Sequence, residues 1–235
     1  SYQGIQQPRF SNHKENLRVL CFTPSFHRAK MLRGCVQDII GQTYQNITHG
    51  INVTYNDQSE VENYDILFHD LKRDNLFITF NKNLHNHINY MNSIRAVPDY
   101  LNYDIYIKID DDDIHLSKYV ETIVEFFKNQ SIDVVSSGVK YQLNGNLMIV
   151  NNSGWGTLGG NPEGSNFKMP MTFAFNRKAL DVLLTIDNPN KLSGKLWRRL
   201  WHESGMIHKI IDIRENLIWH IHGANITTAN FLKKQ

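Results

Sequence analysis

The sequence contains few cysteines, no long apolar run and almost no excess of either charge. Its two cysteines, Cys21 and Cys35, lie in an apolar run and in a segment of helical spacing, which argues against a disulfide framework or a cysteine-based zinc site. No stretch approaches the roughly 18 apolar residues that span a bilayer, and the first residues lack the basic and apolar regions of a signal peptide. We therefore expect a soluble chain in a reducing cytoplasm.

The charge balance argues against nucleic acid as the partner. Lys and Arg number 25 against 23 Asp and Glu, which gives a formal net charge of +2, and no basic patch is present to follow a phosphodiester backbone. Hydrophobic residues make up 41% of the 235 residues, enough to bury one sizeable core. The sequence thus predicts a single domain over residues 16–235, after a polar lead-in at residues 1–15.

Strand and helix patterns alternate through the first half of the domain, residues 16–128. The expected elements are a strand at 18–23 ended by Pro24, a helix at 28–40, strands at 51–55 and 76–80, a helix at 86–95, a strand at 105–109 and a helix at 118–127. Strands separated by helices predict an α/β fold with a mostly parallel sheet covered on both faces. Ligands collect beyond the carboxyl ends of such strands.

The second half, residues 129–235, has a looser pattern and is expected to carry a smaller subdomain. We expect strands at 133–141, 147–151, 171–175, 208–213 and 217–221, and helices at 177–186 and 195–206. A glycine-rich loop at 153–165 interrupts them. A loop of this length is uncommon unless it is functional.

Four consecutive aspartates, Asp110 to Asp113, directly follow the apolar strand at 105–109. Adjacent carboxylates at the end of a sheet repel one another unless a cation or donors compensate them, and Mg²⁺ or Mn²⁺ accepts such oxygen ligands. A calcium loop fits badly, because Ile114 and His115 stand where it needs an oxygen ligand and a glycine. The alternative is an acidic turn that caps the next helix, but one carboxylate suffices for a cap.

Four polar motifs follow one another through the first half. They are ValLeuCysPheThrProSerPheHisArg at 19–28, GlnThrTyrGlnAsn at 42–46, AsnAspGlnSer at 56–59 and IleAspAspAspAspIle at 109–114. This order resembles glycosyltransferase family 2, with its Pro-Thr-Tyr-Asn-Arg-like opening, Gln-Thr-Tyr, Asp-Gly-Ser-like turn and Asp-x-Asp-Asp metal motif. The resemblance covers residues 17 to about 128. It implies a GT-A, Rossmann-like fold.

The resemblance implies donor contacts for residues of the first and third motifs. Pro24, Ser25 and Phe26 would border the nucleotide base, and Arg28 would belong to the nucleotide-sugar site. Asp57 would hydrogen-bond the edge of a uracil-like ring. Without the motif order, Asp57 could equally be a turn residue whose side chain bonds its own backbone.

The resemblance also divides the acidic run into different roles. Asp112 stands at the metal-ligand position, and Asp110 and Asp111 would face the ribose or a metal-bound water. Asp113 would belong to the turn or cap the next helix. The pattern departs from the family at His27, which replaces the usual Asn of the opening motif.

The match is thinner in the second half, where catalysis and acceptor binding are expected. Glu203 resembles the family's catalytic base, although Ser204 replaces the expected partner aspartate, and the alternative is a solvated helix residue. His222, followed by Gly223, resembles an additional metal ligand, against the alternative of a structural histidine. Trp155 in the glycine-rich loop would stack on a sugar ring.

These residues together predict a metal-dependent hexosyltransferase that uses Mn²⁺ or Mg²⁺ and a nucleotide diphosphate sugar, expected to be UDP-linked. The resemblance favours inversion, an oligosaccharide or lipid-linked acceptor, and a place in bacterial surface polysaccharide synthesis. It allows peripheral association with the inner face of the cytoplasmic membrane through regions outside this chain. Two alternatives stay open: a catalytically silent nucleotide- or glycan-binding module, and a metal-dependent nucleotidyltransferase, for which ThrProSerPheHisArg lacks a basic glycine-rich loop.

Overall fold

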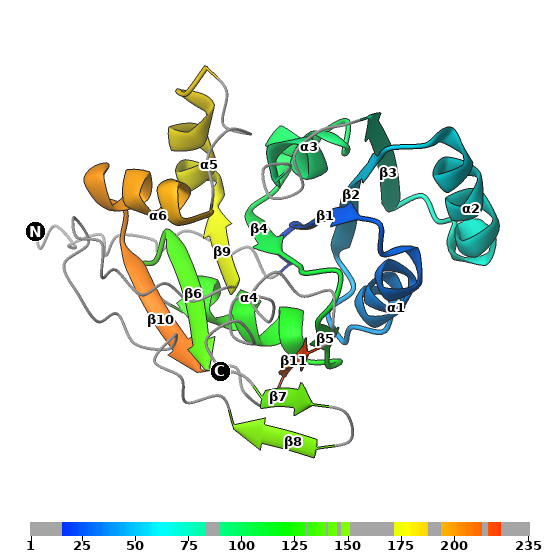
Figure 1. Ribbon diagram of the computed structural model, residues 1–235. Coiled ribbons are helices and arrows are strands. Elements are labelled where there is room, and N and C mark those ends of the chain that lie inside the picture. Colours follow the sequence, from blue (N-terminus) through cyan, green and yellow to red (C-terminus); the bar gives the residue numbers. More distant parts are fainter. Residues whose placement is uncertain are drawn as a thin grey trace, which may run out of the picture.

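A seven-stranded sheet forms the centre of the fold in the computed structural model (Figure 1). The structure describes residues 16–82, 90–129, 131–139, 141–144, 147–150, 172–187, 194–212 and 216–221. The strands of the central sheet are β1 (Val19–Phe26), β2 (Ile47–Tyr55), β3 (Leu76–Lys82), β4 (Ile105–Lys108), β6 (Val134–Val139), β9 (Thr172–Asn176) and β10 (His208–Asp212). They lie in the order β10-β6-β9-β4-β1-β2-β3.

All neighbouring pairs of this sheet are parallel except the two that involve β9, which runs antiparallel to both β4 and β6. The prediction of a mostly parallel sheet is therefore confirmed, and the insertion of one reversed strand is a feature that the sequence pattern did not indicate. Because β4 and β6 are both antiparallel to β9, they point the same way. The carboxyl ends of β1, β2, β4 and β6 thus lie at one edge of the sheet.

Helices cover both faces of the sheet, as expected. They are α1 (Ala29–Ile40), α2 (Gln58–Phe68), α3 (Tyr90–Arg95), α4 (Tyr119–Asn129), α5 (Arg177–Leu184) and α6 (Gly194–Glu203), with 3-10 turns at His69–Leu71 and Tyr100–Asn102. A second, four-stranded sheet has the order β5 (Ile114–His115), β11 (Leu217–Ile221), β7 (Tyr141–Asn144) and β8 (Leu147–Val150). None of the helices in the described ranges is both long and apolar enough to cross a bilayer.

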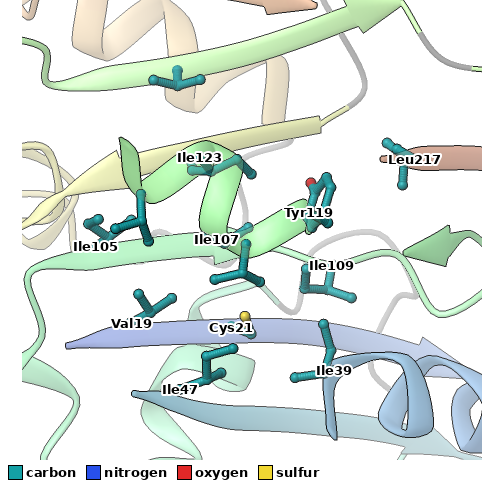
Figure 2. Packing of buried hydrophobic residues seen from close by; sticks show 14 of the residues in the cluster. Val19, Cys21, Ile39, Ile47, Ile105, Ile107, Ile109, Tyr119, Ile123 and Leu217 are labelled. Carbon is teal, nitrogen blue, oxygen red and sulfur yellow. The ribbon is translucent and has the colours of Figure 1, made fainter. Parts of the chain in front are cut away.

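The alternation of side chains along β1 divides the core into two layers. Val19 and Cys21 face one layer, together with residues of α1 and α4, while Leu20 and Phe22 face the other, together with α3, α5 and α6. Figure 2 shows the first layer: Val19, Cys21, Ile105, Ile107, Ile109, Tyr119 and Ile123 gather between the sheet and α4. Both cysteines, Cys21 and Cys35, are buried thiols that form no disulfide.

The first strand continues past Pro24, where the sequence pattern predicted its end. The carbonyl of Phe22 accepts a hydrogen bond from Ile109 on the β4 side, and because backbone groups alternate sides along a strand, Pro24 faces that side too. The last β4 residue is Lys108. The missing N–H of Pro24 therefore costs no ladder hydrogen bond there, and β1 reaches Phe26.

Helix α2 is a further correction, because the interval after Asp57 was expected to hold only a turn before β3. Asp57 is the N-cap, its side chain accepts from the Ser59 N–H, and Glu60 bonds back to the Asp57 N–H. This reciprocal pair is a capping box. The spacing of Asp57 and Glu60 was therefore a helix-start signal that could be read directly in the sequence.

Helix α3 packs so closely on β2 that Gly50 leaves no room for a side chain. A Cβ atom at Gly50 would overlap the carbonyl oxygen of Ser93 and would lie 2.9 Å from Cγ2 of Val97. Gly34, in the middle of α1, is the opposite case, because an added Cβ would meet no atom within 4 Å. The two glycines are therefore a matched pair for testing the packing of α3.

We expect Gly50→Ala to lower the free energy of unfolding by about 1–3 kcal/mol, because the α3 backbone must move to admit the methyl group. Gly34→Ala is the control and should raise that free energy by about 0.5–1 kcal/mol, since alanine favours the helix. Urea denaturation of both variants measures the two effects. Equal stability of Gly50→Ala and the wild type would contradict the close approach.

Candidate functional site

The candidate site lies where two neighbouring parallel strands end. β1 ends at Phe26 and β4 at Lys108, and these strands pair in parallel from Val19 with Ile105 to Phe22 with Lys108. The turn after β1 and the acidic turn after β4 therefore meet at the same edge of the sheet. In this way the fold brings together residues that lie more than 80 positions apart in the sequence.

Asp111 and Asp112 are both bound by side chains from the first motif. The Ser25 hydroxyl donates to Oδ2 of Asp111 at 2.6 Å. Nη1 of Arg28 donates to Oδ1 of Asp111 at 3.0 Å and to Oδ2 of Asp112 at 2.8 Å. The side chains of Asp111 and Asp112 are 6% and 14% exposed, against 20% for Arg28. Ser25 and Arg28, which were predicted to take part in nucleotide-sugar binding, thus contact the acidic run directly.

Asp110 has its own cation, Lys108, the last residue of β4. The Lys108 ammonium lies 2.6 Å from Oδ1 of Asp110 and is 7% exposed. It also lies 5.5 Å and 5.9 Å from the ring centres of Tyr90 and Phe173. Burial lowers the pKa of Lys108, but the Asp110 carboxylate more than offsets this, so the pKa stands above its ordinary value. Asp110 is therefore held by a permanently charged partner.

The acidic turn still carries more negative charge than these two cations offset. Burial and then repulsion by the Asp112 carboxylate raise the pKa of Asp111 to about 7, although Arg28 and the Ser25 hydroxyl both lower it. Asp113 is also buried. An over-acidic, buried group of carboxylates is an environment that an additional cation stabilises.

The chemistry of these carboxylates fits a divalent cation, with Asp112 as the predicted protein ligand. Among the residues that the structure describes, no group of three or more His, Cys, Asp or Glu side chains is arranged to hold a metal ion, so further ligands must come from elsewhere. The predicted ligand His222 lies outside the described residues, as does Trp155 with the glycine-rich loop at 153–165. However, β11 ends at Ile221, directly before His222, and pairs with β5, which begins directly after Asp113.

The GlnThrTyr motif supports the segment that follows the aspartates. Gln42 is 2% exposed; its amide donates to the Leu116 carbonyl at 2.9 Å and its oxygen accepts from the Val120 N–H at 3.0 Å. The carboxylate of Asp38, on α1, accepts from the His115 N–H at 2.8 Å. Gln42 and Asp38 together thus anchor β5 and the start of α4, the segment that directly follows the acidic turn.

The predicted base-binding residues lie along the end of β1 and the start of α2. Pro24 and Phe26 are half-buried, and Asp57 is exposed. The Ser59 N–H holds the pKa of Asp57 below its ordinary value, so its charged carboxylate already has a capping role. Contact with a nucleotide base remains a prediction for Pro24, Phe26 and Asp57.

His27 joins these two regions, which the sequence pattern did not indicate beyond its departure from the family motif. Its backbone φ is 53°, a left-handed conformation that is uncommon for a residue other than glycine. Its ring lies 2.7 Å from the Glu60 carboxylate and 3.0 Å from the Asn56 amide. The turn that carries Arg28 is therefore fastened to the N-terminus of α2 beside Asp57.

Glu203, the predicted catalytic base, lies away from the acidic turn. It ends α6, and the chain then enters β10, whose first residue His208 pairs with Val134 at the start of β6. Glu203 is exposed and forms an ion pair with Arg199 at 2.8 Å. Because β6 points the same way as β4, this end of α6 lies at the amino edge of the sheet, whereas the aspartates follow the carboxyl end of β4. Figure 1 shows α6 at the start of β10. The position of Glu203 matches the solvated helix residue considered as the alternative.

Comparisons with solved structures find proteins of similar fold. No protein-family model and no curated protein matches the sequence. The chain is similar to a mannosyltransferase from Pyrobaculum calidifontis in complex with GDP-Man and Mn²⁺, with a TM-score of 0.60 and 12% identity over 94% of this chain and 62% of that one. It is also similar to the 1–349 part of S. aureus TarS in complex with UDP-GlcNAc, with a TM-score of 0.55 and 11% identity over 91% and 61% of the two chains. The chain thus spans less than two thirds of either structure, and the likeness concerns the fold.

The raised pKa of Asp111 gives the metal-free protein a specific pH dependence. The folded state holds this proton up to about pH 7, whereas an unfolded aspartate releases it near 3.9. The free energy of unfolding therefore falls as the pH rises from about 4 to 7. In EDTA, we expect the stability of Asp111→Asn relative to the wild type to rise between pH 4.5 and 8, by about 3 kcal/mol.

Asp70→Asn is the control for this measurement. Arg33 holds the pKa of Asp70 at about 2, so both its folded and unfolded values lie below pH 4.5, and the effect of this substitution should not change over the same range. Chemical denaturation at several pH values compares the two variants. A pH-independent difference for Asp111→Asn would show that this carboxyl is already ionised at pH 4.5.

Proposed function

We propose that the chain is a metal-dependent GT-A glycosyltransferase that moves a sugar from a nucleotide diphosphate donor to a glycan or lipid-linked acceptor. The observation that carries the proposal is the over-acidic pair Asp111 and Asp112 at the carboxyl edge of a mostly parallel sheet, tied to the turn after β1. Ligands bind at this edge in open α/β sheets. The fold shared with the mannosyltransferase and TarS supports the same assignment.

Asp112 would hold Mn²⁺ or Mg²⁺, with His222 as the proposed second protein ligand. When bound, such a cation supplies positive charge that stabilises the leaving diphosphate. Asp110 and Asp111 would face the ribose or a metal-bound water. Arg28 is the residue of the turn after β1 that can contact a diphosphate, because its guanidinium already reaches the carboxylates that would surround the ion.

The donor base would lie over the end of β1 and the start of α2. Pro24, Ser25 and Phe26 would border it, and the exposed Asp57 would accept a hydrogen bond from its ring edge. UDP is the proposed nucleotide, and Trp155 would stack on the sugar. The two neighbours bound to nucleotide sugars carry GDP-Man and UDP-GlcNAc respectively, so both nucleotides belong in the experiment.

Two further parts of the proposal rest on family resemblance. They are inversion of the anomeric centre and a place in bacterial surface polysaccharide synthesis, at the inner face of the cytoplasmic membrane. A silent nucleotide-binding module is the second candidate. It is favoured by the distance of Glu203 from the acidic turn, because inversion requires a base near the acceptor hydroxyl. The binding and turnover experiments below separate the two candidates.

A thermal-shift screen of UDP-sugars and GDP-sugars, with and without Mn²⁺, tests the proposed function. A ligand that binds only the folded state raises its melting temperature, so we expect a shift for one nucleotide that is larger with Mn²⁺. Asp112→Asn should abolish the Mn²⁺-dependent part and lower the metal-dependent release of the nucleotide by about 100-fold. Asp65→Asn, on the exposed face of α2, is the control. If no nucleotide sugar shifts the wild type, the proposal fails.

Glu203→Gln tests the location of the base. Because Glu203 lies at the amino edge of the sheet and is paired with Arg199, we expect the variant to keep turnover within about twofold of the wild type, whereas loss of a general base lowers turnover by about 10²–10⁴-fold. Steady-state release of the nucleotide with an acceptor present measures the difference. A loss of 100-fold or more would restore Glu203 as the base.

A further inference from the structure

One nitrogen of Arg28 lies between two carboxylates of the acidic turn. Nη1 is 3.0 Å from Oδ1 of Asp111 and 2.8 Å from Oδ2 of Asp112. These are charge-assisted hydrogen bonds at ordinary length. A single guanidinium nitrogen thus brings positive charge to two carboxylates, one of which is the predicted metal ligand Asp112.

A divalent cation held by Asp112 competes with Arg28 for the oxygen atoms of that carboxylate, beside the carboxylate of Asp111 that Arg28 also binds. The guanidinium and the ion repel each other, and their repulsion is strong at a site where the carboxylates are 6% and 14% exposed. Ligation is therefore favoured when Arg28 leaves and finds another anion. The diphosphate of the donor is an anion of the geometry that a guanidinium binds well.

Arg28 has space to move, and the residue before it, His27, contacts the N-terminus of α2. The Arg28 side chain is 20% exposed and lines an open groove of about 560 Å³ between the start of α1 and α2. The preceding residue, His27, has a φ of 53°, and its ring contacts Asn56 and Glu60 beside the predicted base contact Asp57. The nucleotide would thus lie near His27 and the metal near Arg28, and these two residues are adjacent in the turn after β1.

We propose that Arg28 couples metal binding to donor binding: it bridges Asp111 and Asp112 in the unliganded protein and transfers to the donor diphosphate when the metal binds. The inference rests on the proposed function and adds an order to it, since the metal binds weakly until the nucleotide offers Arg28 a new partner. By thermodynamic linkage, the nucleotide strengthens metal binding by the same factor as the metal strengthens nucleotide binding.

Titration of Mn²⁺ by electron paramagnetic resonance, with and without saturating UDP or GDP, tests the coupling without any turnover. In the wild type, the nucleotide should tighten Mn²⁺ binding. In Arg28→Met, Mn²⁺ alone should bind at least about tenfold more tightly than in the wild type, and the additional effect of the nucleotide should shrink by a similar factor. Arg33→Met is the control, because Arg33 lies on α1, directly after the turn that carries Arg28, and pairs with Asp70 instead of the acidic turn.

The effect of the nucleotide on Mn²⁺ affinity distinguishes displacement of Arg28 from simple repulsion between Arg28 and the ion. If Arg28 acts only as a distant charge, Arg28→Met tightens Mn²⁺ binding equally with and without nucleotide, and the inference is overturned. Unchanged Mn²⁺ affinity also overturns it. If the wild type binds neither Mn²⁺ nor nucleotide, the proposed function itself fails, and the inference fails with it.

A second measurement uses the wild-type protein, in case Arg28→Met does not fold. The side-chain Nε–H resonance of Arg28, assigned by comparison with Arg28→Lys, should change position when Mg²⁺ and UDP or GDP are added together. A resonance that stays in place while the metal and nucleotide bind would show that Arg28 keeps its carboxylate partners, which contradicts the proposed transfer.

Discussion

Repulsion among buried carboxylates at the end of β4 is the constraint on which the site depends. Within the run Asp110 to Asp113, Lys108 pairs with Asp110, and Arg28 pairs with Asp111 and Asp112. Even so, burial and Asp112 keep the pKa of Asp111 near 7. An isolated group of this kind would destabilise the fold. The end of β4 and the turn after β1 supply the compensating cations, and Gln42 holds the backbone that follows the aspartates.

Much of this arrangement could be predicted from the sequence because it depends on local signals. The apolar run before four aspartates and the alternation of strands and helices indicate a parallel sheet with its polar site at the strand ends. The contacts of Ser25 and Arg28 with the acidic run follow from that topology. Lys108 was also readable, since a lysine within an apolar strand requires an anionic partner nearby, and Asp110 is two residues away.

The remaining features depend on tertiary structure that one sequence does not reveal. The reversed direction of β9 is set by pairing with β4 and β6, strands that are distant in the chain. Glu203 resembled a catalytic base in its local residues, but its position follows from where α6 enters β10. The left-handed backbone of His27 likewise depends on contacts with α2. Each of these features is decided by a neighbour that is not adjacent in sequence.

The pairing of β5 with β11 has a consequence for when the site can assemble during synthesis. β5 follows the acidic turn directly, and its described partner in the second sheet is a strand about a hundred residues further along the chain, with Leu217 opposite His115 and Ile218 opposite Ile114. A nascent chain therefore cannot complete the surroundings of its aspartates until the residues of β11 have left the ribosome. Assembly of the site therefore follows the synthesis of its acidic residues by about a hundred further residues.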